Sequence, residues 1–405
     1  MPEGALADIT VLDLTHHIAG PYCTKLLATY GAEVIKIERP GTGDPARQAG
    51  PFPGDVPHLE KSGLFLHLNT NKQSVTMNLK QPRGQELVRE LVQQVDVAVE
   101  NFAPRVLPAL GLSYAELERS NPRLVMTSIS NFGQTGPYRD WQAQDMVIYA
   151  MGGAMNITGL PDRTPLRLAL NLMAYQGGNV AATATMTGVF GVHRLGHGQH
   201  IDVSLYEVHA GSIDRRTTGL LGYQYTGEAG YREPAVGIGV YPIGIYPCQD
   251  GYIHTLIFPQ AWERLLAAME MPELRQDARF ADPMARLQAE NRPAFIAIFT
   301  AWLARHTRNE AMAKAQAHRV PLTAVNPPSA VLQDAHFCAR GTFVDVHHPV
   351  AGTLPHTGAP FRMTASPAEP VHPAPLLGQH TDTVLQRRLG LSATDLAELR
   401  RHGII

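Results

Sequence analysis

The alternation of short apolar runs with helical segments constrains the fold of this chain more than any other feature. Residues 9–14 are apolar and rich in β-branched side chains, which predicts a buried strand. Residues 22–30 have helical spacing and are followed by Gly31, a typical residue after a helix, and by a second strand over residues 33–38. This order predicts a β–α–β unit of an open parallel sheet.

The same alternation continues to about residue 130. We expect strands over residues 75–79, 96–100 and 124–129, and a helix over residues 82–94 with proline in its first turn. Ligands bind at the carboxyl ends of the strands in such sheets, so the polar segments after the strands predict a binding crevice. The glycine pattern of a dinucleotide-binding turn is missing after the first strand, which argues against dinucleotide binding.

A change of composition near residue 222 predicts a second, smaller domain. Residues 222–250 are rich in Gly, Pro and Tyr, and a series of helical segments follows them. A chain of 405 residues is long enough for two domains. We therefore assign residues 225–325 to the small domain, and residues 1–224 and 326–405 to the large one.

Charge and cysteine content argue against several functional classes. The formal net charge of −2 does not favour a partner such as nucleic acid or a membrane surface. The three cysteines form no closely spaced pair, and the histidines show no metal-binding spacing, so we expect neither disulfides nor a metal site. No export signal or apolar run of about 18 residues is evident, and we expect a cytoplasmic protein.

Residues 165–184 form the most unusual stretch of the sequence. A run rich in leucine passes through Tyr-Gln-Gly-Gly into a long series of small residues. This pattern predicts a buried strand that leads into a tightly packed helix, with a possible site at the junction.

Eight motifs follow one another along the chain. They are DLTHHIAGP (13–21), GAEVIKIERPGTGD (31–44), NTNKQSV (69–75), VENF (99–102), FGQTGPY (132–138), GHGQHIDVSL (196–205), YPCQDG (246–251) and LGQHT (377–381). In this order they resemble the class III coenzyme A transferases, the CaiB/BaiF family. The resemblance covers nearly the whole chain, which makes it more specific than any single motif.

The resemblance implies an α/β fold with a Rossmann-type open parallel sheet in a coenzyme A-binding large domain, a smaller α+β domain, and an interlocked dimer. It also implies a coenzyme A thioester as substrate, with no tightly bound cofactor, and a carboxylic acid as acceptor. Arg39, Lys72 and Arg105 are candidates for pairing with the coenzyme's phosphates. The full set of implied contacts is His16, His17, Ile18, Ala19, Arg39, Lys72, Gln73, Asn101, Phe102, Arg105 and Tyr138.

The same resemblance implies covalent catalysis by an aspartate, in a pattern like V-P-I-A-D-L-A-A-G. Laid over residues 171–178, the nucleophile position falls on Ala174, and a methyl group cannot attack a thioester. We therefore assign no catalytic residue. Asp145 lies where related racemases carry a His-Asp pair, but Gln144 takes the place of the histidine. We interpret Asp145 as a residue that organises hydrogen bonds.

Three interpretations follow from the missing aspartate. The one we favour is a non-catalytic subunit of a heteromer in which a homologous subunit carries the aspartate, as in succinyl-CoA:benzylsuccinate CoA-transferase. The second is an active homodimer that uses another residue, such as Glu207, or a direct ternary mechanism. The third is a module that binds coenzyme A thioesters without catalysis. Succinyl-CoA as the donor rests on the resemblance alone.

Overall fold

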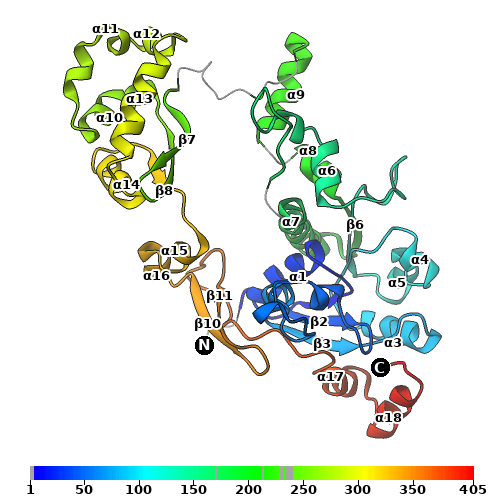
Figure 1. Cartoon of the computed structure of the whole chain (residues 1–405). Helices are drawn as coiled ribbons and strands as arrows, with labels where there is room; N and C mark the ends of the chain where they lie inside the picture. Colours follow the sequence, from blue (N-terminus) through cyan, green and yellow to red (C-terminus); the bar gives the residue numbers. More distant parts are fainter. Residues whose placement is uncertain (1–3, 169–170, 212–213, 229–231, 233–239) are drawn as a thin grey trace. The chain divides into compact units, whose positions relative to one another are not determined.

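The computed structural model describes residues 4–168, 171–211, 214–228, 232 and 240–405. The chain divides into two compact units. One consists of Met1–Thr158, Pro165–Gly230 and Ala339–Ile405, and the other of Gly159–Thr164 and Tyr231–Cys338. The larger unit thus contains both chain ends (Figure 1). The smaller one extends to Cys338, whereas we expected the small domain to end at residue 325.

Six parallel strands form the sheet of the larger unit. They are β1 (Thr10–Asp13), β2 (Glu33–Glu38), β3 (Lys72–Thr76), β4 (Val97–Glu100), β5 (Val125–Ser130) and β6 (Gln199–Ser204). Their order across the sheet is β3-β2-β1-β4-β5-β6, with every neighbouring pair parallel. The predicted open parallel sheet is therefore confirmed. The direction of strand succession reverses between β1 and β4, and the carboxyl ends of these two strands form the expected position for a ligand.

Two element boundaries differ from those predicted. Helix α1 spans Ala19–Thr29 and begins three residues earlier than expected, because Pro21 lies in its first turn, where a proline is tolerated. Strand β3 lies over Lys72–Thr76 instead of residues 75–79. Its first residues are polar and therefore lack the apolar signal of a buried strand, although Lys72 and Ser74 are both buried.

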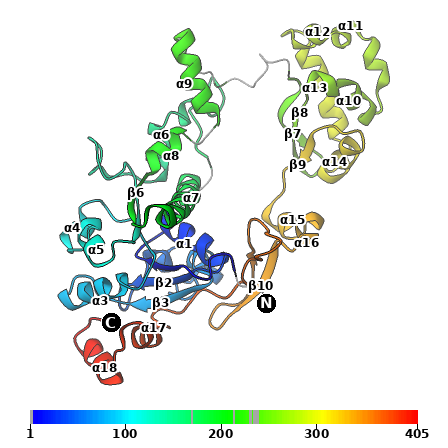
Figure 2. The same cartoon turned by 180° about the vertical axis from the view of Figure 1, so that it is seen from behind.

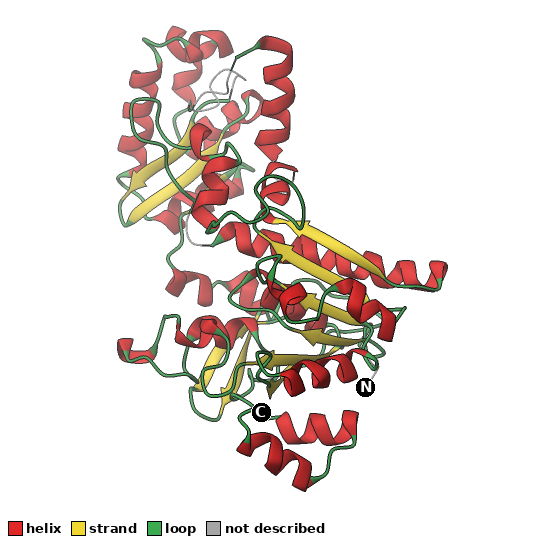
Figure 3. Cartoon of the chain, turned by 90° about the vertical axis from the view of Figure 1, so that its right-hand side faces the viewer, coloured by secondary structure: helices red, strands yellow, loops and turns green. Residues whose placement is uncertain are grey.

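Helices cover both faces of this sheet (Figures 1 and 3). On one face α1 and α7 (Leu172–Leu195) pack on side chains such as Val11, Val34 and Val125. On the other face Leu12, Ile35 and their neighbours contact a second group of helices. This group comprises α3 (Pro82–Val92), α4 (Val106–Ala109), α5 (Tyr114–Ser120), α17 (Thr381–Leu389) and α18 (Ala393–Arg401). Strand residues that alternate between the two cores fix the register of the sheet.

The remaining elements of the larger unit include a hairpin near the carboxyl terminus. Strands β10 (Phe343–His348) and β11 (Gly352–Thr357) pair in antiparallel fashion, and the segment after them has little regular structure before α17, beside β3 (Figure 2). The other helices of this unit are α2 (Gly63–Leu68), α6 (Asp145–Met151), α8 (Leu205–Gly211) and α9 (Asp214–Thr226). Helix α16 (Ala335–Ala339) belongs to the smaller unit except for its last residue.

The smaller unit has a three-stranded antiparallel sheet, β7 (Ile243–Cys248), β8 (Gly251–Leu256) and β9 (Leu322–Ala324). Its core is aromatic, with Trp262, Phe280, Phe295 and Phe299 fully or almost fully buried. Its helices are α10 (Trp262–Ala268), α11 (Ala278–Ala281), α12 (Pro283–Leu287), α13 (Arg292–Leu303), α14 (Arg308–Ala317) and α15 (Pro328–Leu332). The unit is therefore of the expected α+β type.

The strand predicted before α7 is wrong. Residues 165–168 have no regular structure, and Leu166 and Leu168 are exposed, so the leucine-rich run is not a core strand; residues 169–170 lie outside the described residues. The tightly packed helix is confirmed. A Cβ at Gly178 would lie 2.7 Å from the carbonyl oxygen of Ala19, so the two helices approach at backbone distance.

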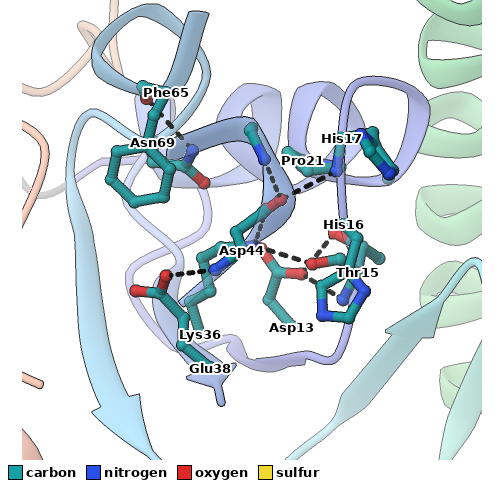
Figure 4. Close-up of polar contacts among 12 residues, drawn as sticks. Asp13, Thr15, His16, His17, Pro21, Lys36, Glu38, Asp44, Phe65 and Asn69 are labelled. Carbon is teal, nitrogen blue, oxygen red and sulfur yellow. Dashed lines mark hydrogen bonds and ion pairs between the residues drawn. The ribbon is translucent and has the colours of Figure 1, made fainter. Parts of the chain in front are cut away.

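Buried charges tie β1, β2 and β3 together where the first turn begins (Figure 4). Asp13 accepts hydrogen bonds from the hydroxyls of Thr15 and Thr24, and its Oδ2 lies 3.0 Å from Lys72 Nζ. Burial opposes the ionisation of Asp13, but Lys36 and Lys72 outweigh it and hold the pKa of this carboxyl well below its usual range. The group is therefore an ionised carboxylate inside the protein.

A second buried group lies within the segment of residues 40–59. Arg47 is fully buried and donates to both carboxylate oxygens of Glu38, at 2.7 and 2.8 Å. Asp44 is also fully buried, and its Oδ2 lies 2.9 Å from Lys36 Nζ. The segment therefore contributes charges that the sheet needs, in addition to its exposed residues.

We predict that Gly178→Ala lowers the free energy of unfolding by roughly 1–3 kcal/mol, because the new methyl group meets backbone that cannot move aside. Gly191→Ala in the same helix is the matched control, since its nearest neighbour is the end of the Gln199 side chain, at 3.2 Å. The control should be neutral or more stable by up to about 1 kcal/mol. Denaturant titration of both variants measures this, and equal values would contradict the close packing of α1 and α7.

We also predict that Asp13→Asn lowers the free energy of unfolding by about 3–5 kcal/mol, because it leaves buried lysine charge uncompensated. Because folding depresses the pKa of Asp13, the difference from the wild type is fully present above about pH 4 and shrinks as the pH falls further. Denaturant titrations at several pH values test this. Asp8→Asn, at an exposed site, should change stability by no more than about 0.5 kcal/mol.

Candidate functional site

The turn after β1 and the turn after β4 meet at the switch point of the sheet. Asn101 Oδ1 accepts a hydrogen bond from the His16 N–H at 2.8 Å, and Asn101 Nδ2 donates to the His16 carbonyl oxygen at 2.7 Å. The neighbouring His17 has a φ of 64°, which is strained for a residue with a side chain, and its N–H donates to Asp44. The turns are thus held in place by the side chains of Asn101, which is partly buried, and Asp44, which is fully buried.

Five of the expected coenzyme contacts lie in or beside these turns: His16, His17, Asn101, Phe102 and Ile18. The rings of His16 and Phe102 meet edge to face, with centroids 5.0 Å apart. Burial, followed by the charge of Lys36, lowers the pKa of His16 to about 4. The imidazole is therefore neutral at pH 7 and offers one N–H donor and one acceptor to a ligand.

A cavity of about 220 Å³ lies beside this pair of turns. Its lining includes Ala19, Asn101, Phe102 and Arg105 from the expected set, together with Ala103, Pro104, Ile129, Ser130, Asn131, Arg139, Asp140, Trp141, Gln142 and Leu205. Two arginines therefore face one pocket, which suits an anionic ligand with several negative oxygens. The described lining contains one carboxylate, Asp140.

The sequence reasoning missed Arg139 and Trp141. Both belong to the loop after β5, and the only available signal was a basic and an aromatic residue at the carboxyl end of a core strand. Trp141 stacks on Tyr138 with centroids 3.9 Å apart, and Phe132 meets the edge of both rings. Tyr138, an expected contact, therefore supports Trp141 and does not itself line the cavity.

The other expected contacts lie elsewhere. Lys72 is buried and donates to Asp13, Thr24 and Asn69, so its ammonium serves the core and we do not include it in the candidate site. Gln73 contacts Arg387 of α17, away from the crevice. Arg39 directly follows β2, and its side chain is exposed.

The buried carboxyl group of Glu100 stabilises the turn at Asn101 and Phe102. Glu100 Oε2 accepts a hydrogen bond from the Phe102 N–H at 2.8 Å. Burial raises the pKa of Glu100 to about 7, and Asp202 adds to the effect, while hydrogen bonds from Ser128 and Phe102 oppose it. This side chain fixes the turn without lining the cavity.

A second cavity, of about 270 Å³, lies at the start of α7. Its lining residues are Gln144, Asp145, Met146, Tyr149, Arg167, Leu168, Asn171, Leu172 and Met173. Ala174 N–H donates to Asp145 Oδ1 at 2.8 Å, and Asp145 also accepts from the amide of Met173. The expectation that Asp145 organises hydrogen bonds thus matches its contacts. Glu207, the substitute nucleophile considered above, is exposed on α8 and does not line this cavity.

One segment joins the two cavities. Residues 139–142 line the first cavity and residues 144–146 line the second. Asn131 Nδ2 donates to the carbonyl oxygen of Ala143, between them, at 2.8 Å. Because successive Cα atoms are only 3.8 Å apart, the two cavities are near neighbours along this segment.

In the part of the chain that the structure describes, no group of three or more His, Cys, Asp or Glu side chains is arranged to hold a metal ion. None of the described helices combines the length and the apolar character that a bilayer crossing requires.

Comparison with known proteins gives a consistent result. The model of CoA-transferase family III matches residues 6–381. A succinyl-CoA–D-citramalate CoA-transferase from Chloroflexus aurantiacus is 36% identical, with 100% of this chain and 99% of the relative covered. A formyl-CoA:oxalate CoA-transferase from Bradyrhizobium diazoefficiens is 32% identical, with 99% and 97% covered.

Comparison of the fold with solved structures also indicates this family. A crystal structure of a CaiB/BaiF family protein from Brucella suis has a TM-score of 0.85 at 29% identity, covering 95% of this chain and 100% of that one. The similarity therefore extends over sheet, crevice and smaller unit alike. Because the family model and full-length relatives above 30% identity agree, the chain belongs to CoA-transferase family III.

Proposed function

We propose that this chain is a subunit of a class III CoA-transferase that moves coenzyme A from an acyl-CoA, with succinyl-CoA as the donor, to a carboxylic acid. The observation that carries the proposal is a cavity lined by two arginines and two aromatic residues at the switch point of a family III fold. The named relatives act on succinyl-CoA with D-citramalate and on formyl-CoA with oxalate. Their chemistry supports a small carboxylic acid as the acceptor.

The lining residues fit the parts of the coenzyme. Arg105 and Arg139 supply guanidinium groups, which pair with phosphate oxygens in a bidentate manner. Phe102 and Trp141 offer aromatic faces and edges against which a planar base can pack. The neutral imidazole of His16 stands beside Phe102 and can exchange hydrogen bonds with an amide of the pantetheine arm.

Ala174 leads us to place the nucleophile in a partner. The alanine is at the start of α7, beside the second cavity, where the family pattern has its aspartate. A homologous subunit with aspartate at this position would complete the enzyme, and this chain would contribute fold and binding. The homodimer that uses another residue is the second candidate, and the contact between Asp145 and the Ala174 amide favours it.

Coenzyme binding tests the general proposal. Arg139→Ala should weaken the binding of coenzyme A by roughly tenfold or more, because a charge-assisted hydrogen bond contributes about 1.5–3 kcal/mol. Titration calorimetry with coenzyme A measures this. Arg123→Ala is the matched control, since Arg123 is exposed just before β5, at the opposite edge of the sheet. Absence of coenzyme binding by the wild type would refute the proposal as a whole.

Isotope exchange tests the role of Ala174. We expect the purified chain alone to exchange labelled succinate into succinyl-CoA only at background level, and Ala174→Asp to raise the rate about 100-fold or more by supplying a nucleophile. Ala174→Asn is the control of equal size without a carboxylate. Exchange by the wild type at the rate of Ala174→Asp would contradict the assignment of this chain as the non-catalytic subunit.

A further inference from the structure

Glu100 places a carboxyl group next to the cavity that we assign to the anionic coenzyme. It ends β4 and is 4% exposed, and its Oε2 is 2.8 Å from the N–H of Phe102, which lines that cavity. The cavity measures only about 220 Å³, so a phosphate inside it lies close to Glu100. At a separation of roughly 10 Å, one negative charge raises the proton affinity of a carboxyl group about tenfold at the effective dielectric constant of proteins.

Glu100, Ser128 and Asp202 form a row across three neighbouring strands. Ser128 of β5 is the register partner of both Glu100 on β4 and Asp202 on β6, so the three side chains share one face of the sheet. Burial raises the pKa of Glu100 to about 7, and Asp202 adds to the rise, while hydrogen bonds from Ser128 and Phe102 oppose it. Glu100 is therefore close to half protonated at neutral pH, where a nearby charge changes its protonation most easily.

A chain of hydrogen bonds serves Glu100 in both of its charge states. The Ser128 hydroxyl bonds to Glu100 and also lies 2.9 Å from Nε2 of His200. A serine hydroxyl both donates and accepts, and a neutral imidazole carries its proton on either nitrogen. When Glu100 is ionised, His200 donates to Ser128 and Ser128 donates to Glu100. When Glu100 is protonated, both bonds reverse. His200 is exposed, so the chain also connects the buried carboxyl group with solvent.

Several other titratable or charged groups lie on the elements around Glu100. They are Asp202 and His200 on β6, Tyr114 on α5, His16 in the turn after β1, and Arg105 directly before α4. Asp13 of β1 is in register with residue 99 and therefore belongs to the opposite face. Burial lowers the pKa of His16 to about 4 and raises that of Tyr114, so neither changes charge near pH 7. Burial also lowers the pKa of His200, which leaves this imidazole neutral there.

We propose that Glu100 takes up a proton when coenzyme A binds, so that the turn after β4 presents a neutral carboxyl group to the anionic ligand. The proton comes from solvent through His200 and Ser128. The phosphate charges favour protonated Glu100, and by linkage protonated Glu100 favours binding. Coenzyme affinity therefore falls as the pH rises through about 7, where the carboxyl group ionises. Glu100 acts through the turn as a positioning residue, and the inference rests on the proposed binding of coenzyme A in this cavity.

Calorimetric titration of the full chain with coenzyme A, in buffers that differ in ionisation enthalpy, counts the protons taken up on binding. At pH 7 we expect the wild type to take up roughly 0.4 proton more than Glu100→Gln, which corresponds to a tenfold rise in the proton affinity of Glu100. The titration of the coenzyme's own phosphate is common to both proteins and cancels in the difference. Glu398→Gln, at an exposed glutamate of α18, is the control and should match the wild type.

The affinities give a second signature, which structural damage would not produce. The glutamine amide accepts from the Phe102 N–H and donates to Ser128, as the protonated carboxyl group does, so Glu100→Gln resembles the state that favours the ligand. At about pH 8.5 this variant should bind coenzyme A roughly fivefold or more tighter than the wild type, and at about pH 6 the two should agree within about twofold. His200→Gln keeps a donor and an acceptor for Ser128 and should retain the proton uptake of the wild type.

Difference infrared spectroscopy tests the wild type directly. Binding of coenzyme A should add the carbonyl band of a protonated carboxyl group, and this added band should be missing in Glu100→Gln. Equal proton uptake by wild type and Glu100→Gln, or loss of the uptake only in His200→Gln, would overturn the inference. Binding without the proton difference refutes only the role of Glu100, whereas absent binding refutes the proposed function.

Discussion

The ionised Asp13 in the middle of the sheet is the constraint on which the rest of the larger unit depends. A buried carboxylate is tolerated only when charges and hydrogen bonds replace the water that it has lost. Here Lys72 comes from β3, Lys36 from β2, and Thr24 from α1. Three further elements therefore supply the partners of Asp13, directly before the turn that carries His16 and His17.

In the candidate site, the residues proposed to bind coenzyme A and the position proposed for the nucleophile lie on different elements. In the function that we propose, coenzyme recognition depends on the turns after β1, β4 and β5, and Asn101 holds the first two of these turns together. The residue that the family resemblance aligns with the nucleophile, Ala174, lies in the first turn of α7, which packs through Gly178 against α1. A methyl group at residue 174 removes the carboxylate without disturbing either feature. The chain therefore has the fold of its family together with alanine at residue 174.

Asp145 connects the start of α6 with the start of α7 beside the second cavity. Asp145 begins α6 and caps the amides that begin α7, so one carboxylate both stabilises the helix start and borders the cavity. Capping of this kind is common and is sufficient to explain the residue as a structural element.

Local patterns in the sequence determined the β–α–β alternation, the parallel sheet and the presence of helices in the smaller unit. These features depend on residues close together in the chain. The predictions from sequence failed where contacts between different segments of the chain determine which residues are buried. Lys72 and Arg47 are residue types usually found at the surface, but Lys72 is buried against Asp13 and Arg47 against Glu38 and the distant carbonyl of Pro375. Leu166 and Leu168, in the leucine-rich run before α7, are exposed. The pairing of Asp145 with Ala174, and the meeting of Arg105 with Arg139 in one cavity, likewise required the tertiary structure, because no local periodicity encodes which loops come together at a sheet edge.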